Sequence, residues 1–120
     1  MYSDKLVDHA KNPRNMGEMD DADALGEAED PISKDLIYVY LKIKDGNIFQ
    51  ISFQTYGSAI SLACSSILTE LVKGKTLQEA DKITANDLVI ILNDVPKKIM
   101  PSCNLAINGL HAAIKNYYEK

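Results

Sequence analysis

The side chains in this sequence that could do chemistry are few: two cysteines, two histidines and two serines placed where helices are expected to begin. A cysteine becomes a nucleophile or a metal ligand as the thiolate, which a helix N-terminus or a nearby cation favours. Cys64 lies nearly two turns into an expected helix, and Cys103 lies closer to a helix start. Both fall on apolar helical stripes, where free cysteine usually packs as a small hydrophobe. We therefore expect Cys64 to be an inert core residue.

The serines and histidines carry weaker signals. Ser58 and Ser102 stand where helices are expected to start, and their ordinary role there is to cap the backbone. Neither serine lies in a G-x-S-x-G elbow, so a serine-based enzyme is not favoured. His9 and His111 have no neighbour at metal-ligand spacing and are expected at the surface. We predict that the protein is not an enzyme.

A β-hairpin is the clearest element that the sequence predicts. Two strand-like runs within residues 35–56 flank Asp45-Gly46, a pair that suits a type I′ turn. The first run is apolar on both faces, which indicates a central strand. Alternation in the second run predicts that Phe49, Ile51 and Phe53 share one buried face, with Ile48 on the other.

Helical periodicity dominates elsewhere. Helices are expected over residues 3–11, over 58–73, from about 76, over 84–93 and from 102 onward. Pro96 and Pro101 are expected to bracket a loop before Ser102 opens the last helix. Strands followed by helices predict an α+β fold, a two-layer sandwich.

Composition limits the class of protein. The 120 residues suit one domain with its own core, spanning 1–120. A net charge of −4 argues against nucleic acid as a partner. With no apolar run long enough for a membrane and no signal-like start, a cytoplasmic protein without membrane contact is expected. The seven acidic residues within 18–30 indicate a solvated edge segment, or alternatively a cation or partner site.

Several motifs together resemble the IscU/NifU-type scaffold family of iron–sulfur cluster assembly. They are "NPRNMG" at 12–17, "SKD" at 33–35, "TYGSA" at 55–59, "TELVKGKTLQEA" at 69–80 and "VPKKIMPSCNLA" at 95–106. The resemblance covers the whole chain. It implies a SufE/NifU-like fold, in which an antiparallel three-stranded sheet packs against helices.

The resemblance also implies a site. In that family three cysteines and an aspartate, often with a histidine, hold a nascent [2Fe–2S] cluster and receive sulfur from a cysteine desulfurase. Thiolates are soft ligands, which suit clusters of iron and sulfide. Family members are not enzymes.

This sequence departs from the family at most ligand positions. Serine stands at all three cysteine positions, which are Ser33, Ser58 and Ser102, and only Asp35 matches. The glycines after the first and second cysteines and the histidine before the third are also replaced, here by Lys34, Ala59 and Pro101. Those further changes favour a naturally diverged, degenerate paralogue over three isolated Cys→Ser substitutions.

Two functions stay open at this stage. In the first, Asp35 and Cys103, the latter after a one-residue shift of the helix start, bind iron or a [2Fe–2S] cluster weakly, and a homo-oligomer could join two such half-sites. In the second, the protein binds no cofactor and docks to a cysteine desulfurase or another assembly protein. The loop that family members offer to a chaperone reads "VPKKI" at 95–99, so chaperone binding is not expected.

Overall fold

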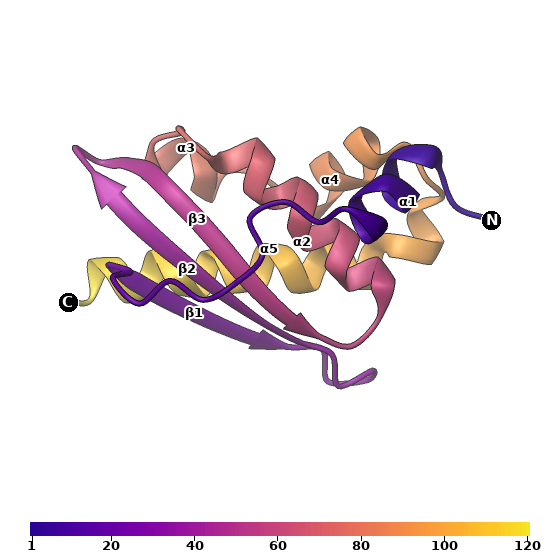
Figure 1. The fold of residues 1–120 in the computed structure, drawn as a ribbon, viewed down its shortest axis with the longest axis horizontal. Coiled ribbons are helices and arrows are strands. Elements are labelled where there is room, and N and C mark those ends of the chain that lie inside the picture. Colours follow the sequence, from indigo (N-terminus) through magenta and orange to yellow (C-terminus); the bar gives the residue numbers. More distant parts are fainter.

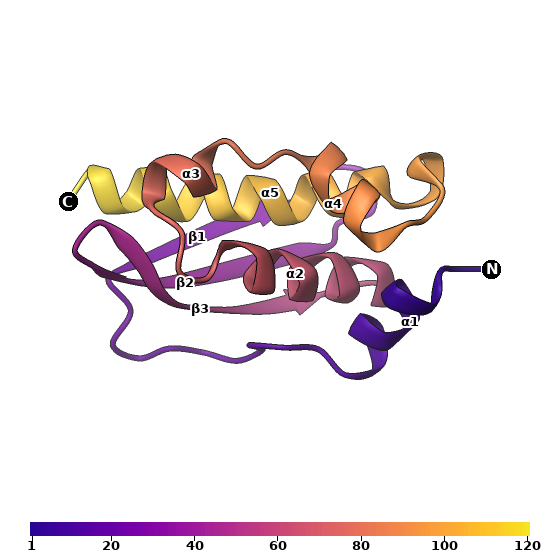
Figure 2. The ribbon, with the colours of Figure 1, turned by 90° about the horizontal axis from the view of Figure 1, so that it is seen from above.

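The computed structural model describes residues 1–120 as a sheet covered on one face by helices (Figures 1 and 2). The elements in chain order are α1 (Asp4–Lys11), β1 (Ala24–Glu29), β2 (Leu36–Lys44), β3 (Asn47–Tyr56), α2 (Ala59–Val72), α3 (Leu77–Asp81), α4 (Ala85–Leu92) and α5 (Pro96–Tyr118). One continuous core of 26 buried residues lies between the two layers. The predicted α+β two-layer sandwich is confirmed. None of the five helices combines the length and apolar character needed to cross a membrane.

The sheet is an antiparallel meander in the order β1-β2-β3. The β2–β3 turn has positive φ at both central residues, 53° at Asp45 and 78° at Gly46, as the type I′ turn requires. β2 is the central strand, as its apolar pattern predicted. β1 lies within the acidic segment 18–30 and is an edge strand of the sheet. The sequence predicted an edge position for this segment.

A β-bulge changes which residues of β3 are buried. Gln50 pairs with Lys42 and Ile48 with Ile43, which leaves Phe49 as an extra residue between them. The extra residue inverts the alternation at the start of the strand, so that Ile48 is 0% exposed and Phe49 is 49% exposed. The prediction that placed Phe49 on the buried face and Ile48 opposite was wrong for this reason.

α5 starts earlier than the sequence predicted. It begins at Pro96, a residue that suits the first position of a helix, and runs through Pro101. Ser102 therefore lies in the second turn and does not open the helix. The buried stripe of Cys103, Ala106 and Leu110 extends back to Ile99 at helical spacing. Burial of that stripe outweighs the backbone hydrogen bond that Pro101 cannot donate.

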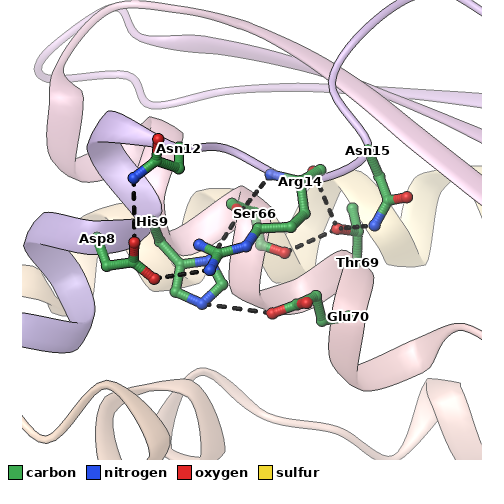
Figure 3. A network of polar contacts seen from close by, with 8 residues as sticks. All are labelled: Asp8, His9, Asn12, Arg14, Asn15, Ser66, Thr69 and Glu70. Atoms are coloured by element: carbon green, nitrogen blue, oxygen red, sulfur yellow. Dashed lines mark hydrogen bonds and ion pairs between the residues drawn. The ribbon is translucent and has the colours of Figure 1, made fainter.

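The N-terminal "NPRN" segment is tied to α2 by the polar network in Figure 3. The backbone N–H of Arg14 donates to Ser66 Oγ at 2.9 Å, and Asn15 Nδ2 donates to Thr69 Oγ1 at 3.0 Å. Arg14 also pairs with Asp8 of α1. Gly17 and Asn15 then exchange backbone hydrogen bonds with Phe53 of β3. The segment thus fixes α1 and one edge of the sheet against α2.

His9 is at the centre of this network and is only 2% exposed, which corrects the expectation of a surface residue. Its Nδ1 lies 2.7 Å from Ser66 Oγ, and its Nε2 lies 3.4 Å from Glu70 Oε1. These contacts fit the neutral ring, with the Ser66 hydroxyl donating to Nδ1 and the Nε2–H group facing Glu70. Burial, reinforced by the Arg14 charge, lowers the pKa of His9 despite the opposing effect of Glu70.

Protonation of His9 should therefore destabilise the fold. Below the ordinary histidine pKa of about 6.5, His9 is protonated in the unfolded chain but stays largely neutral in the folded protein, where its pKa is lower. Because the unfolded state then binds more protons, the free energy of unfolding falls as pH drops from about 7.5 to about 5.5. Urea unfolding midpoints at the two pH values test this. His9→Gln should show a smaller drop than the wild type. Ile107→Val, which removes a buried methyl group from α5 without touching the network, should keep the full drop. An unchanged drop in His9→Gln would assign the acid sensitivity to other groups.

Candidate functional site

The four positions that the sequence singled out for cluster ligands come together at one end of the molecule. Ser33 and Asp35 lie in the turn before β2, Ser58 caps α2, and Ser102 lies in α5. This is the end of the sheet where β3 passes into α2 (Figure 1).

Asp35 is the hub of the group. Its Oδ2 accepts the backbone N–H of Ser58 at 3.0 Å and the hydroxyl of Ser61 at 2.9 Å. The Asp35 backbone N–H donates to Ser33 Oγ at 3.2 Å. The N–H of Ser58 at the start of α2, followed by the serine hydroxyls, lowers the pKa of Asp35.

Ser61 links the hub to α5, and sequence reasoning missed it. Its Oγ lies 3.1 Å from Ser102 Oγ and 3.2 Å from Ser58 Oγ, and it is 1% exposed. Because a hydroxyl has one hydrogen, which Ser61 gives to Asp35, the other two serines donate to Ser61. Its place three residues after the α2 cap, on the same side of the helix, was the available signal. We call Ser33, Asp35, Ser58, Ser61 and Ser102 the oxygen cluster.

The backbone around the oxygen cluster is special at two residues. At Gly57 φ is +152°, and a Cβ there would overlap the Asp35 carboxylate, so only glycine lets the aspartate reach the start of α2. Lys34 has φ +68°, a left-handed conformation that glycine adopts more readily. At a position where the resemblance expects glycine, this chain thus holds lysine in a conformation that glycine adopts more readily.

Both thiols lie behind the oxygen cluster in the core. Cys64 and Cys103 are each 0% exposed, and their Sγ atoms are 3.3 Å apart. The hydrogen bond with Cys103, together with burial, raises the pKa of the Cys64 thiol well above its ordinary range. The expectation that Cys64 is a core residue is confirmed. Cys103 packs beside it, and its thiol is hydrogen bonded to Cys64 and to no member of the oxygen cluster.

The donor set can be tested against the chemistry of iron–sulfur clusters. The oxygen cluster contains one carboxylate and four hydroxyls but no thiol or imidazole. No group of three His, Cys, Asp or Glu side chains anywhere in the protein is arranged to hold a metal ion. His111 pairs with Asp81 at 3.8 Å, and His9 is committed to the network of Figure 3. As it stands, the site is a hydrogen-bonded junction that is poorly matched to a [2Fe–2S] cluster.

Removing the hub should loosen this end of the protein. Asp35→Ala leaves the Ser58 N–H and the buried Ser61 hydroxyl without their acceptor, and we expect a loss of about 1–2 kcal/mol in the free energy of unfolding. Urea titration measures the loss. Glu29→Ala, at an exposed position in β1, is the matched control and should change stability by less than about 0.5 kcal/mol. Equal stabilities for the two variants would contradict the assignment of Asp35 as the hub.

Comparison with known proteins adds the family. The model of the NifU-like N terminal domain matches residues 1–120. A protein of Archaeoglobus fulgidus named "Iron-sulfur cluster assembly scaffold protein IscU 1" is 47% identical over 120 residues, which are 100% of this chain and 78% of that protein. The protein of Escherichia coli K12 named "Iron-sulfur cluster assembly scaffold protein IscU" is 39% identical, over 99% of this chain and 95% of its own length.

A solved structure agrees in fold. The N-terminal part of a NifU-like protein from Brucella abortus superposes with a TM-score of 0.79 at 18% identity, covering 98% of this chain and 94% of that one. The curated relatives are named scaffold proteins, in agreement with the expectation from sequence that this chain is not an enzyme. On the full-length family match and these identities, the chain belongs to the NifU-like N-terminal domain family.

Proposed function

We propose that this protein serves iron–sulfur cluster assembly as a scaffold-family member whose own capacity to bind a cluster is weakened or lost. The observation that carries the proposal is the hydrogen bonding of Asp35 to Ser58 and Ser61, with Ser61 in turn bonded to Ser102. Residues at the positions expected to bind the cluster are instead hydrogen bonded within the oxygen cluster.

Ligand chemistry supports this proposal. Iron–sulfur clusters are held mainly by thiolates, and serine hydroxyls do not ionise near neutral pH. Ser33, Ser58 and Ser102 can therefore retain the local packing of cysteines without their affinity for iron and sulfide. Asp35 is the one ionised group at these positions, and its Oδ2 already accepts two hydrogen bonds.

Weak binding of iron through Asp35 and Cys103 would require a rearrangement. Cys103 follows Ser102 within the continuous helix α5 and faces Cys64 in the core. To replace Ser102 at the site it would have to turn by one residue, about 100° around the helix axis. Such a turn would also withdraw Leu110 and the rest of the apolar stripe from the core.

Restoring sulfur to the cluster positions should restore cluster binding. We expect the wild type, incubated anaerobically with ferrous iron and sulfide and then desalted, to keep little or no visible charge-transfer absorbance. The variant with Ser33→Cys, Ser58→Cys and Ser102→Cys should retain a cluster under the same conditions, because thiolates would then surround Asp35.

A control variant shows whether position matters. Ser65→Cys together with Ser66→Cys adds thiols to the buried part of α2 and should give no retained absorbance. Circular dichroism first establishes that each variant is folded. A tightly held cluster in the wild type, lost on Cys103→Ser, would overturn the proposal in favour of an Asp35–Cys103 site.

A second candidate function is docking to an assembly partner, by class a cysteine desulfurase, without a bound cluster. The observation that favours it is the exposure of two large apolar side chains that neighbour residues of the oxygen cluster in sequence. Ile32 is 91% exposed in the turn that carries Ser33, and Tyr56 is 56% exposed just before Ser58. Large apolar side chains exposed beside a site are candidates for a protein–protein contact. A cytoplasmic protein with these features would meet the desulfurase directly.

Calorimetric titration with a purified cysteine desulfurase tests the docking function. We expect the wild type to bind and Ile32→Glu to bind at least about tenfold more weakly, because a charge replaces an apolar anchor. Ile90→Glu, on the exposed face of α4, should bind like the wild type. No heat of binding with the wild type, or equal affinities for the two variants, would reject docking at this surface.

A further inference from the structure

The two buried cysteines form a site that the cluster-assembly function does not use. They are the only cysteines of the chain and lie 39 positions apart in sequence, Cys64 in α2 and Cys103 in α5. The fold nevertheless places their sulfur atoms 3.3 Å apart with no other side chain between them. Neither sulfur is exposed to solvent.

A hydrogen bond next to the two cysteines holds α2 and α5 close together. Ser61, three residues before Cys64, hydrogen bonds to Ser102, the residue before Cys103. Ala106, one turn further along α5, is also fully buried. A disulfide needs its sulfurs at about 2.05 Å. To form the bond, the two sulfur atoms would have to approach each other by about 1 Å.

We propose that Cys64 and Cys103 are a dithiol/disulfide couple that closes in place and covalently joins α2 to α5 behind the oxygen cluster. The oxidant is a small uncharged peroxide. One thiol attacks the O–O bond, becomes a sulfenic acid and releases one water. The second thiol then displaces the sulfenic oxygen as a second water and forms the S–S bond. In sum, two thiols and one hydrogen peroxide give one disulfide and two waters, with two electrons passing from sulfur to oxygen.

Burial decides which reagents reach the couple. Bulky or charged thiol reagents are excluded because both side chains are fully buried, whereas hydrogen peroxide is close to water in size. A buried thiol that stays protonated reacts slowly, so the couple behaves as a staple formed over long exposure and not as a fast peroxide sensor.

The staple would stabilise the protein. It closes a loop of about forty residues, which restricts the unfolded chain strongly. For a domain of this size we expect the melting temperature to rise by about 5–10 °C after allowance for some strain. The staple joins the helix that carries Ser58 and Ser61 to the helix that carries Ser102, so it fixes the spacing within the oxygen cluster.

The test uses the reduced wild-type protein under native conditions. It is exposed to hydrogen peroxide, denatured in the presence of an alkylating agent and analysed by mass spectrometry after proteolysis. We expect a peptide containing the Cys64–Cys103 cross-link, no alkylation at either residue and a higher melting temperature. The original melting temperature should return once the oxidised protein has been unfolded in urea with dithiothreitol and refolded, because unfolding exposes the buried bond to the reductant. Cys64→Ser and Cys103→Ser should show no peroxide-dependent rise in melting temperature. If either serine variant is unfolded, Cys64→Ala and Cys103→Ala replace them as controls. The return of the wild-type melting temperature after reduction is then a further test that needs no variant.

Three results would overturn the couple. These are sulfinic acid at either cysteine without a cross-link, a cross-link only between separate chains, and a cross-link that appears only when urea unfolds the protein. The experiment uses no iron, sulfide or desulfurase. A negative result would therefore not bear on the proposed role in cluster assembly, and a negative result for that role would not bear on disulfide formation.

Discussion

A single carboxylate at the start of α2 organises the end of the molecule where the site lies. Asp35 accepts hydrogen bonds from the Ser58 backbone and the Ser61 hydroxyl, and it can approach only because residue 57 is glycine. Negative charge at a helix N-terminus is stabilising, and here it also joins the turn before β2 to α2 and, through Ser61, to α5. Three elements far apart in sequence are thus held together by one ionised group.

The interface between α2 and α5 has two levels, and their chemistry differs. At the surface end, Ser61 meets Ser102 through oxygen, while one turn deeper Cys64 meets Cys103 through sulfur. Oxygen suits the outer level because hydroxyls can be fully hydrogen bonded beside a carboxylate and water. Sulfur suits the inner level because a protonated thiol costs little to bury. The soft atoms that would bind iron are therefore present in the protein but lie in its core.

Local patterns in the sequence were enough for most of the fold. The Asp45-Gly46 turn, the capping box that begins at Thr76 and the helix caps follow from side-chain chemistry within a few residues. The errors came from packing between distant segments. The bulge at Phe49, the early start of α5 and the burial of His9 each depend on contacts that periodicity along one segment does not reveal. Of the site, the sequence located four positions through resemblance, but it missed Ser61, whose role depends on where α5 lies.

The family motifs of this chain divide into two physical groups that can change separately. "NPRN" is used inside the fold, where the Arg14 backbone and the Asn15 side chain bond to α2, and its loss would detach α1 and one edge of the sheet. At Ser33, Ser58 and Ser102 the structural role is local: each serine makes hydrogen bonds within the oxygen cluster, and serine is close to cysteine in size. Under the proposed function, serine in place of cysteine there would change the affinity for metal with little effect on folding. On this proposal a chain can keep the scaffold and its surfaces while the ligands of the cluster are replaced, and the hydrogen bonds of Asp35 with Ser58 and Ser61 would occupy the vacated positions.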